Sequence, residues 1–169
     1  GVVAAYSHVL QSHIHLAKVK FPAGTNGKQL DAIARAPLWA VGLDFAHGTG
    51  HGVGHVLSVH EGPASISKRG EVALEAGMVL SNEPGYYQTG DWGIRIENLI
   101  VVTPAKQTGF LEFETITLCP LDRRLIDKTR LDAGEVGWID HYHRAVYEQL
   151  HPHLSPMAKS WLEAACCQL

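Results

Sequence analysis

The stretch MVLSNEPGYYQTGDWGIRIENLIVVT, residues 78–103, contains two strand-like runs with a turn-forming segment between them. The runs cover residues 78–82 and 92–103, and both contain Val and Ile or Leu side chains that suit a pleated surface. The two-residue period of a strand places Ile94 and Ile96 on one face of the second run. The stretch therefore predicts strands with one apolar face, and this prediction is the starting point for the fold.

Charged residues of this stretch lie where they could act together. Glu83 comes directly before Pro84, and a proline favours an extended conformation in the residue that precedes it. Arg95 and Glu97 lie on the face of the second run that is opposite to the two isoleucines. Each feature also has a plain explanation, because strand ends often expose a glutamate and half-exposed strands often carry an ion pair. The pattern alone leaves both explanations open.

A segment rich in glycine and histidine precedes this stretch, with the sequence HGTGHGVGH at residues 47–55. His47 and His51 are four residues apart, as in the helical HExxH motif of zinc proteases. However, no Glu follows His47, and each of the four glycines in residues 48–54 would cost a helix about 1 kcal/mol relative to Ala. We therefore expect a loop or an irregular strand whose backbone approaches another part of the chain closely.

The outer parts of the chain show helical patterns and one further strand-like run. Apolar residues recur at helical spacing in residues 2–20, 28–41 and 132–150, and a short helix is expected to begin after Ser155 as its N-cap. The further strand-like run covers residues 110–118. This order of elements predicts an α+β fold in which helices cover one face of a mainly antiparallel sheet.

The composition excludes some classes of partner. The chain has 169 residues, 46% of them hydrophobic, which is enough for one domain with a sizeable core. A net charge of −3 provides no electrostatic reason to expect a nucleic acid or an anionic membrane as partner, and no apolar run approaches the length of a membrane span. The three cysteines are odd in number, which favours a reducing compartment, and we expect a cytoplasmic protein.

The combination of His51, Glu83 and Glu97 indicates a metal site. These residues offer one imidazole and two carboxylates from separate elements of the fold. Such nitrogen and hard oxygen donors suit Mn²⁺, Co²⁺, Zn²⁺ or Fe²⁺ better than a soft metal. A site rich in carboxylates can also hold two ions, which can activate a water molecule for peptide hydrolysis.

Five motifs in order give the chain its resemblance to a known family. HGTGHGVG, VHEGP, LEAGMV, NEPGYY and GIRIEN resemble the motifs of the pita-bread metallopeptidases, and those of aminopeptidase P (Xaa-Pro aminopeptidase) most closely. The resemblance extends over nearly the whole chain. It implies the C-terminal portion of the pita-bread fold, with a curved, mainly antiparallel sheet. It also implies an enzyme that hydrolyses the N-terminal Xaa-Pro peptide bond with a dinuclear metal site.

The resemblance assigns a role to seven residues. It implies His51, Glu83 and Glu97 as metal ligands, with Glu97 bridging the two ions. The residues implied in catalysis are His47, His60, Glu83 and Arg95, where Glu83 is the proton carrier and Arg95 supports the bridging carboxylate. The residues implied in substrate binding are His47, His60 and Tyr87. His55 has no counterpart in the family, and we expect it to make a local hydrogen bond or to be exposed.

The chain departs from the family in one respect. The family's metal centre also uses two Asp that lie on strands well upstream of the metal histidine, but only Asp31 and Asp44 precede His51 here, and neither lies in the expected Asp-Gly turn. We therefore expect residues 1–169 to be the C-terminal part of a pita-bread peptidase domain, without the strands that carry those two Asp. Such a chain would hold one ion or none and would be inactive alone.

The remaining expectations concern the intact enzyme. We expect two divalent metal ions, with Mn²⁺ first and Co²⁺ or Zn²⁺ as alternatives. The substrate would be a peptide with proline at its second position, and the protein would be a homo-oligomer. Two alternatives remain open from the sequence: a prolidase-type dipeptidase, and a non-catalytic pita-bread module that binds peptides.

Overall fold

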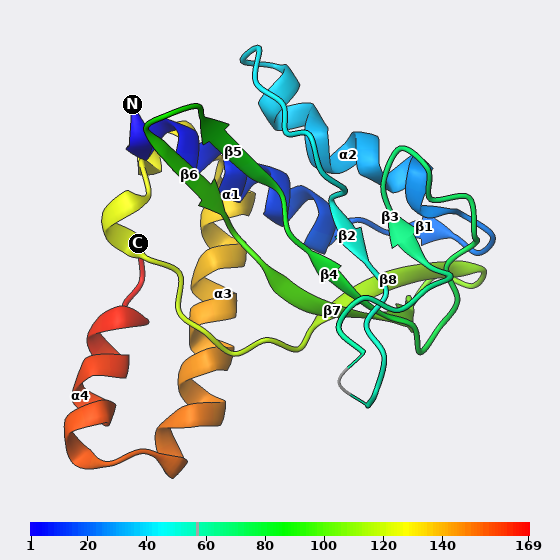
Figure 1. Cartoon of the computed structure of the whole chain (residues 1–169). Helices are drawn as coiled ribbons and strands as arrows, with labels where there is room; N and C mark the ends of the chain where they lie inside the picture. The colour runs from blue at the N-terminus through cyan, green and yellow to red at the C-terminus, as the bar shows by residue number, and fades with distance from the viewer. Residues whose placement is uncertain (57) are drawn as a thin grey trace. The chain divides into compact units, whose positions relative to one another are not determined.

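The computed structural model describes residues 1–56 and 58–169 (Figure 1). The chain divides into two compact units, one of residues 1–7 with 118–169 and the other of residues 8–117. Helix α1 (Val2–Lys18) contributes its first residues to the former unit and the rest to the latter. In the described part of the chain, we find no helix with the length and hydropathy that a membrane crossing requires.

The described residues of the unit 8–117 form three antiparallel sheets and helix α2 (Gly27–Trp39), besides most of α1. The four-stranded sheet has the order β1-β8-β7-β4, with β1 (Phe21–Pro22), β4 (Val79–Asn82), β7 (Asn98–Pro104) and β8 (Phe110–Thr115). The two-stranded sheets pair β2 (Gly50–His51) with β3 (Ser65–Ile66), and β5 (Gly85–Gln88) with β6 (Trp92–Arg95). The expected antiparallel α+β architecture is confirmed.

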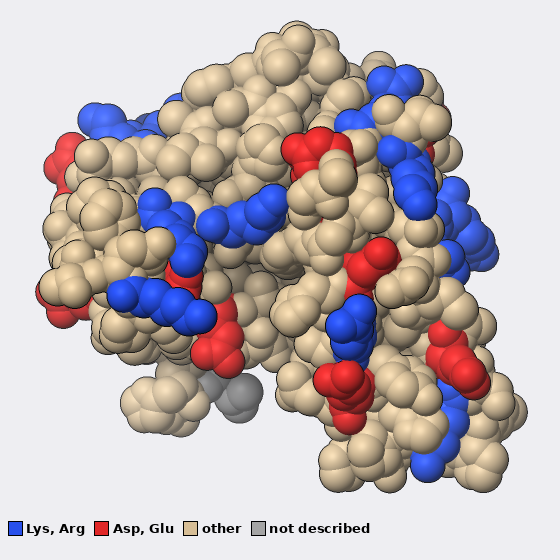
Figure 2. Space-filling view, turned by 180° about the vertical axis from the view of Figure 1, so that it is seen from behind, with Lys and Arg blue, Asp and Glu red and all other residues tan. Residues whose placement is uncertain are grey.

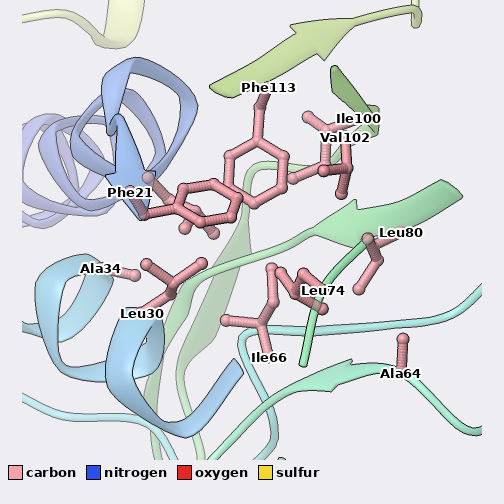
Figure 3. Packing of buried hydrophobic residues seen from close by; sticks show 11 residues of the cluster. Phe21, Leu30, Ala34, Ala64, Ile66, Leu74, Leu80, Ile100, Val102 and Phe113 are labelled. Carbon is pink, nitrogen blue, oxygen red and sulfur yellow. The ribbon is translucent and has the colours of Figure 1, made fainter. Parts of the chain in front are cut away.

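One buried apolar cluster fixes these elements against each other. It joins Leu16 of α1 and Leu30 of α2 to sheet residues such as Leu80, Ile100 and Phe113, all of them nearly inaccessible to solvent. In β7 burial alternates along the strand, so that Ile100 and Val102 point into this cluster. Figure 3 shows these side chains meeting between the strands and α2. The C-terminal part of α1 and the side of α2 that carries Leu30 and Ala34 therefore cover one face of the sheet.

The strand boundaries differ from the expectation in several places: the turn-forming segment after residue 82 contains β5, and the run 110–118 ends as a strand at Thr115. The run 92–103 is two strands, β6 and β7, because residues 96–97 leave the ladder. The segment 21–27, expected to be a turn, begins with β1, which pairs with β8 through its backbone. Backbone pairing of two residues leaves no periodic pattern in the sequence, so this strand carried no signal.

The other unit is mainly helical. It contains α3 (Ala133–Leu150), α4 (Pro156–Ala165) and three 3₁₀ turns at Arg123–Leu125, Lys128–Arg130 and His151–His153. Ser155 caps α4 by accepting a hydrogen bond from the Ala158 amide, which confirms the predicted start of that helix.

Acidic and basic side chains are interspersed over the face shown in Figure 2, and no large area carries a single sign of charge.

Candidate active site

The histidine loop, residues 44–51, ends in the two-residue strand β2. Gly50 pairs with Ile66, and Gly52 forms a bridge with Leu80. A Cβ atom on Gly50 would collide with the carbonyl oxygen of Ser81, and one on Gly52 would collide with a neighbouring backbone oxygen as well. The predicted close approach of the backbone is therefore confirmed, and only glycine permits it.

Helix α2 holds the histidine loop through the buried Arg35. Its guanidinium donates hydrogen bonds to Asp31 Oδ2 (2.8 Å), to Asp44 Oδ1 (2.7 Å) and to the carbonyl oxygens of Phe45 and His47 (2.7 Å each). The other oxygen of Asp31 accepts a 2.6 Å bond from the Thr49 hydroxyl. Both Asp that precede His51 are thus engaged by Arg35, so neither is available as the missing metal ligand.

Glu83 and Glu97 lie opposite each other on the glutamate ribbon, residues 79–101. Strand β4 pairs with β7 and β5 pairs with β6 in one continuous register, in which partners are equally far from Gly90 along the chain. Residues 83–84 and 96–97 connect the two ladders and belong to neither of them. The Ile96 amide links these two connections by donating to the Pro84 carbonyl at 3.2 Å. The two glutamates therefore occupy matching positions on the two strands of the ribbon, Glu83 buried and Glu97 exposed.

His51 and Glu83 are in direct contact. His51 Nδ1 lies 3.0 Å from the Gly52 carbonyl, which can only accept, so Nδ1 carries a proton and Nε2 of the neutral ring has a lone pair. This Nε2 lies 3.2 Å from Glu83 Oε1, which is also an acceptor. The buried Ser81 hydroxyl donates to the same Oε1 at 2.9 Å and accepts from the His51 amide at 3.0 Å. Ser81 thus holds His51 and Glu83 together, with room for a proton or a metal ion between Nε2 and Oε1.

These donors fit a divalent metal ion in part. The 3.2 Å between His51 Nε2 and Glu83 Oε1 would suit a single metal ion. If the ion lay about 2.1 Å from each atom, the angle between the two metal–ligand bonds would be close to a right angle. Glu97 is exposed and occupies the position opposite Glu83 in the strand register. Within residues 1–56 and 58–169, however, no three His, Cys, Asp or Glu side chains are gathered as a complete metal site. Of the three predicted ligands, His51 and Glu83 are in contact, and Glu97 is not among the described residues that line the cavity beside them.

A second set of contacts joins Glu83 to three other predicted residues. Arg95 Nη1 lies 3.6 Å from Glu83 Oε2, and Arg95 Nε donates to the Tyr87 hydroxyl at 2.9 Å. His47 Nδ1 lies 2.8 Å from the Gly48 carbonyl, which can only accept. The Nε2 atom of the same ring forms a hydrogen bond with the Tyr87 hydroxyl at 2.9 Å. A continuous network therefore connects the two strands of the ribbon to the histidine loop.

A cavity of about 710 Å³ opens over these residues. His47, His51, His60, Glu83 and Arg95 line it, and the rings of His51 and His60 lie 4.3 Å apart. Another part of its wall is formed by Ser65, Ser67, Lys68 and Arg69. His55 is exposed and does not line this cavity. The concave surface, its histidines and its carboxylate have the character of a small-molecule or peptide site.

His13 of α1 supports the base of the glutamate ribbon. Asn82 Nδ2 donates to the His13 carbonyl at 3.0 Å, and Asn98 Nδ2 donates to His13 Nε2 at 3.1 Å. All three residues are buried, and the two asparagines are cross-strand partners that directly adjoin Glu83 and Glu97 in the chain. Burial lowers the pKa of His13 to about 4. Hydrogen bonds with the backbone at Ile96 and Asn82 act to raise this pKa, but burial has the larger effect.

Sequence reasoning missed Arg35, Ser81 and His13 as supports of the site. Arg35 left one signal, because Asp31 and Arg35 form an i, i+4 pair beside the apolar positions of a helix. His13 and the link from Ser81 to His51 left none, because the partners are distant in the chain. The Ser81 hydroxyl meets an amide 30 residues away, and His13 meets Asn98 over 85 residues.

Comparison with known proteins identifies a family and its relatives. Residues 2–104 match the model of metallopeptidase family M24, and residues 109–169 match that of the C-terminal region of peptidase_M24. The probable Xaa-Pro aminopeptidase P of Coprinopsis cinerea is 46% identical over 95% of this chain and 28% of its own length. Aminopeptidase P1 of Lotus japonicus is 45% identical over 96% of this chain and 26% of its own length. The chain thus spans about a quarter of the length of these relatives.

Solved structures show the same likeness. A Caenorhabditis elegans X-prolyl aminopeptidase, described as a cytosolic enzyme with a di-nuclear active site, has a TM-score of 0.94 and 42% identity. That match covers 99% of this chain and 29% of the other. An Xaa-Pro dipeptidase from Bacillus anthracis has a TM-score of 0.58 and 36% identity, over 69% of this chain and 31% of the other. The curved antiparallel fold with its helices is that of these peptidases.

Proposed function

Because the chain belongs to metallopeptidase family M24, we propose that it forms the C-terminal part of the active site of an Xaa-Pro aminopeptidase. The reaction is hydrolysis of the first peptide bond of a substrate whose second residue is proline. One observation carries the proposal: His51 Nε2 and Glu83 Oε1 lie 3.2 Å apart, with Glu97 opposite Glu83 in strand register. The names of the relatives support the choice of substrate.

We assign His51, Glu83 and Glu97 as this chain's ligands to two divalent ions, with Mn²⁺ preferred over Co²⁺ or Zn²⁺. The di-nuclear site of the C. elegans enzyme supports the number of ions. When bound, the ions lower the pKa of a water molecule and polarise the substrate carbonyl. The remaining carboxylates would be two Asp outside this chain, because Asp31 and Asp44 both pair with Arg35.

The other residues of the cavity orient the substrate and move protons. Glu83 is the proton carrier, since its carboxylate accepts from Ser81 on one side and lies near Arg95 on the other. His60 steadies the substrate carbonyl as negative charge develops on it. His47 also lines the cavity and orients the peptide substrate, and the Tyr87 hydroxyl holds its ring at Nε2. Arg95 holds Tyr87 and Glu83 in one arrangement.

The decisive experiment measures cleavage of Xaa-Pro-Xaa peptides with Mn²⁺, Co²⁺ and Zn²⁺. We expect turnover by a longer protein that contains this chain, and little or none by the 169-residue chain alone. Three ligands supply only two negative charges, which is too little to hold two dications together. Comparable turnover by the two proteins would refute this account of the missing carboxylates.

A second assay separates the aminopeptidase from a prolidase-type dipeptidase. The longer protein should cleave Ala-Pro-Ala much faster than Ala-Pro, because an aminopeptidase must leave room for residues beyond the proline. The reverse preference would favour the dipeptidase, and binding of peptides without any cleavage would favour a non-catalytic module. We also propose a cytosolic homo-oligomer, which cell fractionation and light scattering would test; the described location of the C. elegans enzyme supports the first part.

A further inference from the structure

Arg35 makes more polar contacts than any structural need of its own helix explains. Its side chain is 2% exposed, and its guanidinium donates to two carboxylates and to two backbone carbonyls. Burial acts to lower the pKa of Arg35, but the hydrogen bonds that it donates to both aspartates outweigh this effect and raise the pKa, so the group remains charged. A buried charge of this kind persists only where its acceptors surround it.

All but one of these acceptors belong to the histidine loop. Asp44, Phe45 and His47 are tied to Arg35, and Thr49 is tied to its partner Asp31. Strand pairing begins only at Gly50. The loop before Gly50 has no ladder, and its path is defined by hydrogen bonds with α2, by one bond from the Glu83 amide to the Thr49 carbonyl and by the Tyr87 contact with the His47 ring.

The two histidines of the loop are held by different means. His51 belongs to β2, where it pairs with Ser65, and its amide bonds to Ser81. None of these contacts involves Arg35. His47 instead gives its carbonyl to Arg35 Nη2 at 2.7 Å.

A second contact links Arg35 to the His47 ring. The Arg35 guanidinium lies 3.9 Å from the centre of the Phe45 ring, and that ring lies 4.8 Å from the His47 ring. The guanidinium therefore restrains His47 at the backbone and at the side chain. A change at Arg35 should displace His47 and leave His51 in place.

We propose that Arg35 is a positioning residue that sets the His47 imidazole for the substrate, independently of the metal ligands. This inference rests on the proposed function, in which His47 orients the peptide. Arg35 touches neither the substrate nor the ions, and it acts through the carbonyl of His47 and the ring of Phe45.

The test uses Arg35→Lys in the longer protein that contains this chain. Lysine keeps the charge, but its single ammonium cannot reproduce the planar fork that reaches four acceptors. We expect kcat/KM for an Xaa-Pro-Xaa peptide to fall by about 10- to 100-fold, as for other groups that orient an active-site residue. The Kd for Mn²⁺, measured by competition with a chelating dye, should stay within about twofold of wild type, since His51 and Glu83 keep their contacts.

A double-mutant cycle and a crystal structure distinguish positioning from general damage. In a His47→Ala background, Arg35→Lys should have little further effect on kcat/KM, because its target is already gone. In the crystal structure of Arg35→Lys, the His47 ring should move while His51 stays in place. Leu30→Ala is the matched control: it weakens the core side of α2 without touching the loop, and should lower Tm while leaving kcat/KM near wild type.

The outcomes separate this inference from the proposed function. A fall in Mn²⁺ affinity that matches the loss of activity would overturn the inference, and so would an undiminished effect of Arg35→Lys in the His47→Ala background. An equal loss of activity in Leu30→Ala would overturn it too. If the wild-type protein cleaves no Xaa-Pro peptide, the proposed function fails, and an unmoved His47 ring in the crystal structure would still overturn the inference.

Discussion

The histidine loop and the glutamate ribbon meet at one cavity, but different forces hold them. The ribbon is an antiparallel ladder whose continuous register places Glu83 opposite Glu97. The loop has no ladder before Gly50, and hydrogen bonds from Arg35 and Asp31 of α2 hold it. Many backbone bonds share the restraint in the ribbon, whereas in the loop most of it falls to Arg35 and Asp31, with single bonds to Glu83 and Tyr87 beside them. A single substitution should therefore damage the loop more than the ribbon.

The largest effect is expected for Arg35→Met in the 169-residue chain. The substitution leaves the buried Asp31 carboxylate without its ion-pair partner, which costs about 3–5 kcal/mol of unfolding free energy. Urea denaturation followed by circular dichroism measures it. The control is Lys20→Met, whose partly exposed pair with Glu112 should contribute less than about 1 kcal/mol. Equal losses in the two variants would contradict the comparison.

The base of the ribbon should respond to pH through His13. Its pKa is about 4 in the folded chain and near 6.5 when unfolded, so the unfolded chain binds more protons between these values. Stability is therefore fully present above about pH 6.5 and falls by about 3 kcal/mol as the pH drops to about 4.

The control for this pH effect is His13→Gln, which removes the titrating group. Urea midpoints measured from pH 8 to pH 4 should fall less steeply for this variant than for wild type. Parallel curves for the two proteins would show that His13 does not carry the effect.

Ser81→Ala should have an intermediate effect, because this hydroxyl joins the two regions. Its loss removes a donor to Glu83 and leaves the His51 amide without its acceptor, at a cost of about 1–3 kcal/mol. Ser12→Ala is the matched control, since Ser12 is equally buried and its hydroxyl has no hydrogen-bond partner among the described residues. If thermal unfolding shifts equally for both variants, Ser81 does not link the loop to the ribbon.

The smallest effect is expected at the turn of the ribbon. Gly90 has a φ of 75°, where a side chain is strained, so Gly90→Ala should destabilise the chain by about 1 kcal/mol. Gly137→Ala lies in α3 with open space around it, and should stabilise the chain by a similar amount. The opposite signs of the two changes in Tm make this pair informative, and equal signs would contradict the account of the turn.

The sequence predicted the elements whose signals are local. The helical patterns of residues 2–20, 28–41 and 132–150 correspond to α1, α2 and α3 to within two residues at each end. The strand-like runs at 78–82 and 110–118 likewise contain β4 and β8. Periodicity and capping residues act between neighbours in the chain, so they can be recognised without a structure.

The gap in the run 92–103 shows where local signals fail. Residues 96–97 have the alternation of a strand, yet they leave the ladder opposite Pro84, which has no amide hydrogen to offer. The partner strand decided this break, and the run's own residues carried no sign of it. The same holds for β1, which exists only because β8 lies beside it.

The sequence by itself determined which residue types and motifs the site contains, since the five motifs identify the histidines, the glutamates, Arg95 and Tyr87. Only the tertiary structure decided how they meet. It brought His51 against Glu83, set Glu97 opposite, and committed Asp31 and Asp44 to Arg35 instead of a metal. The physical reason is that hydrogen bonds and ion pairs act over a few ångströms in space, and distance along the chain does not reveal which groups come that close.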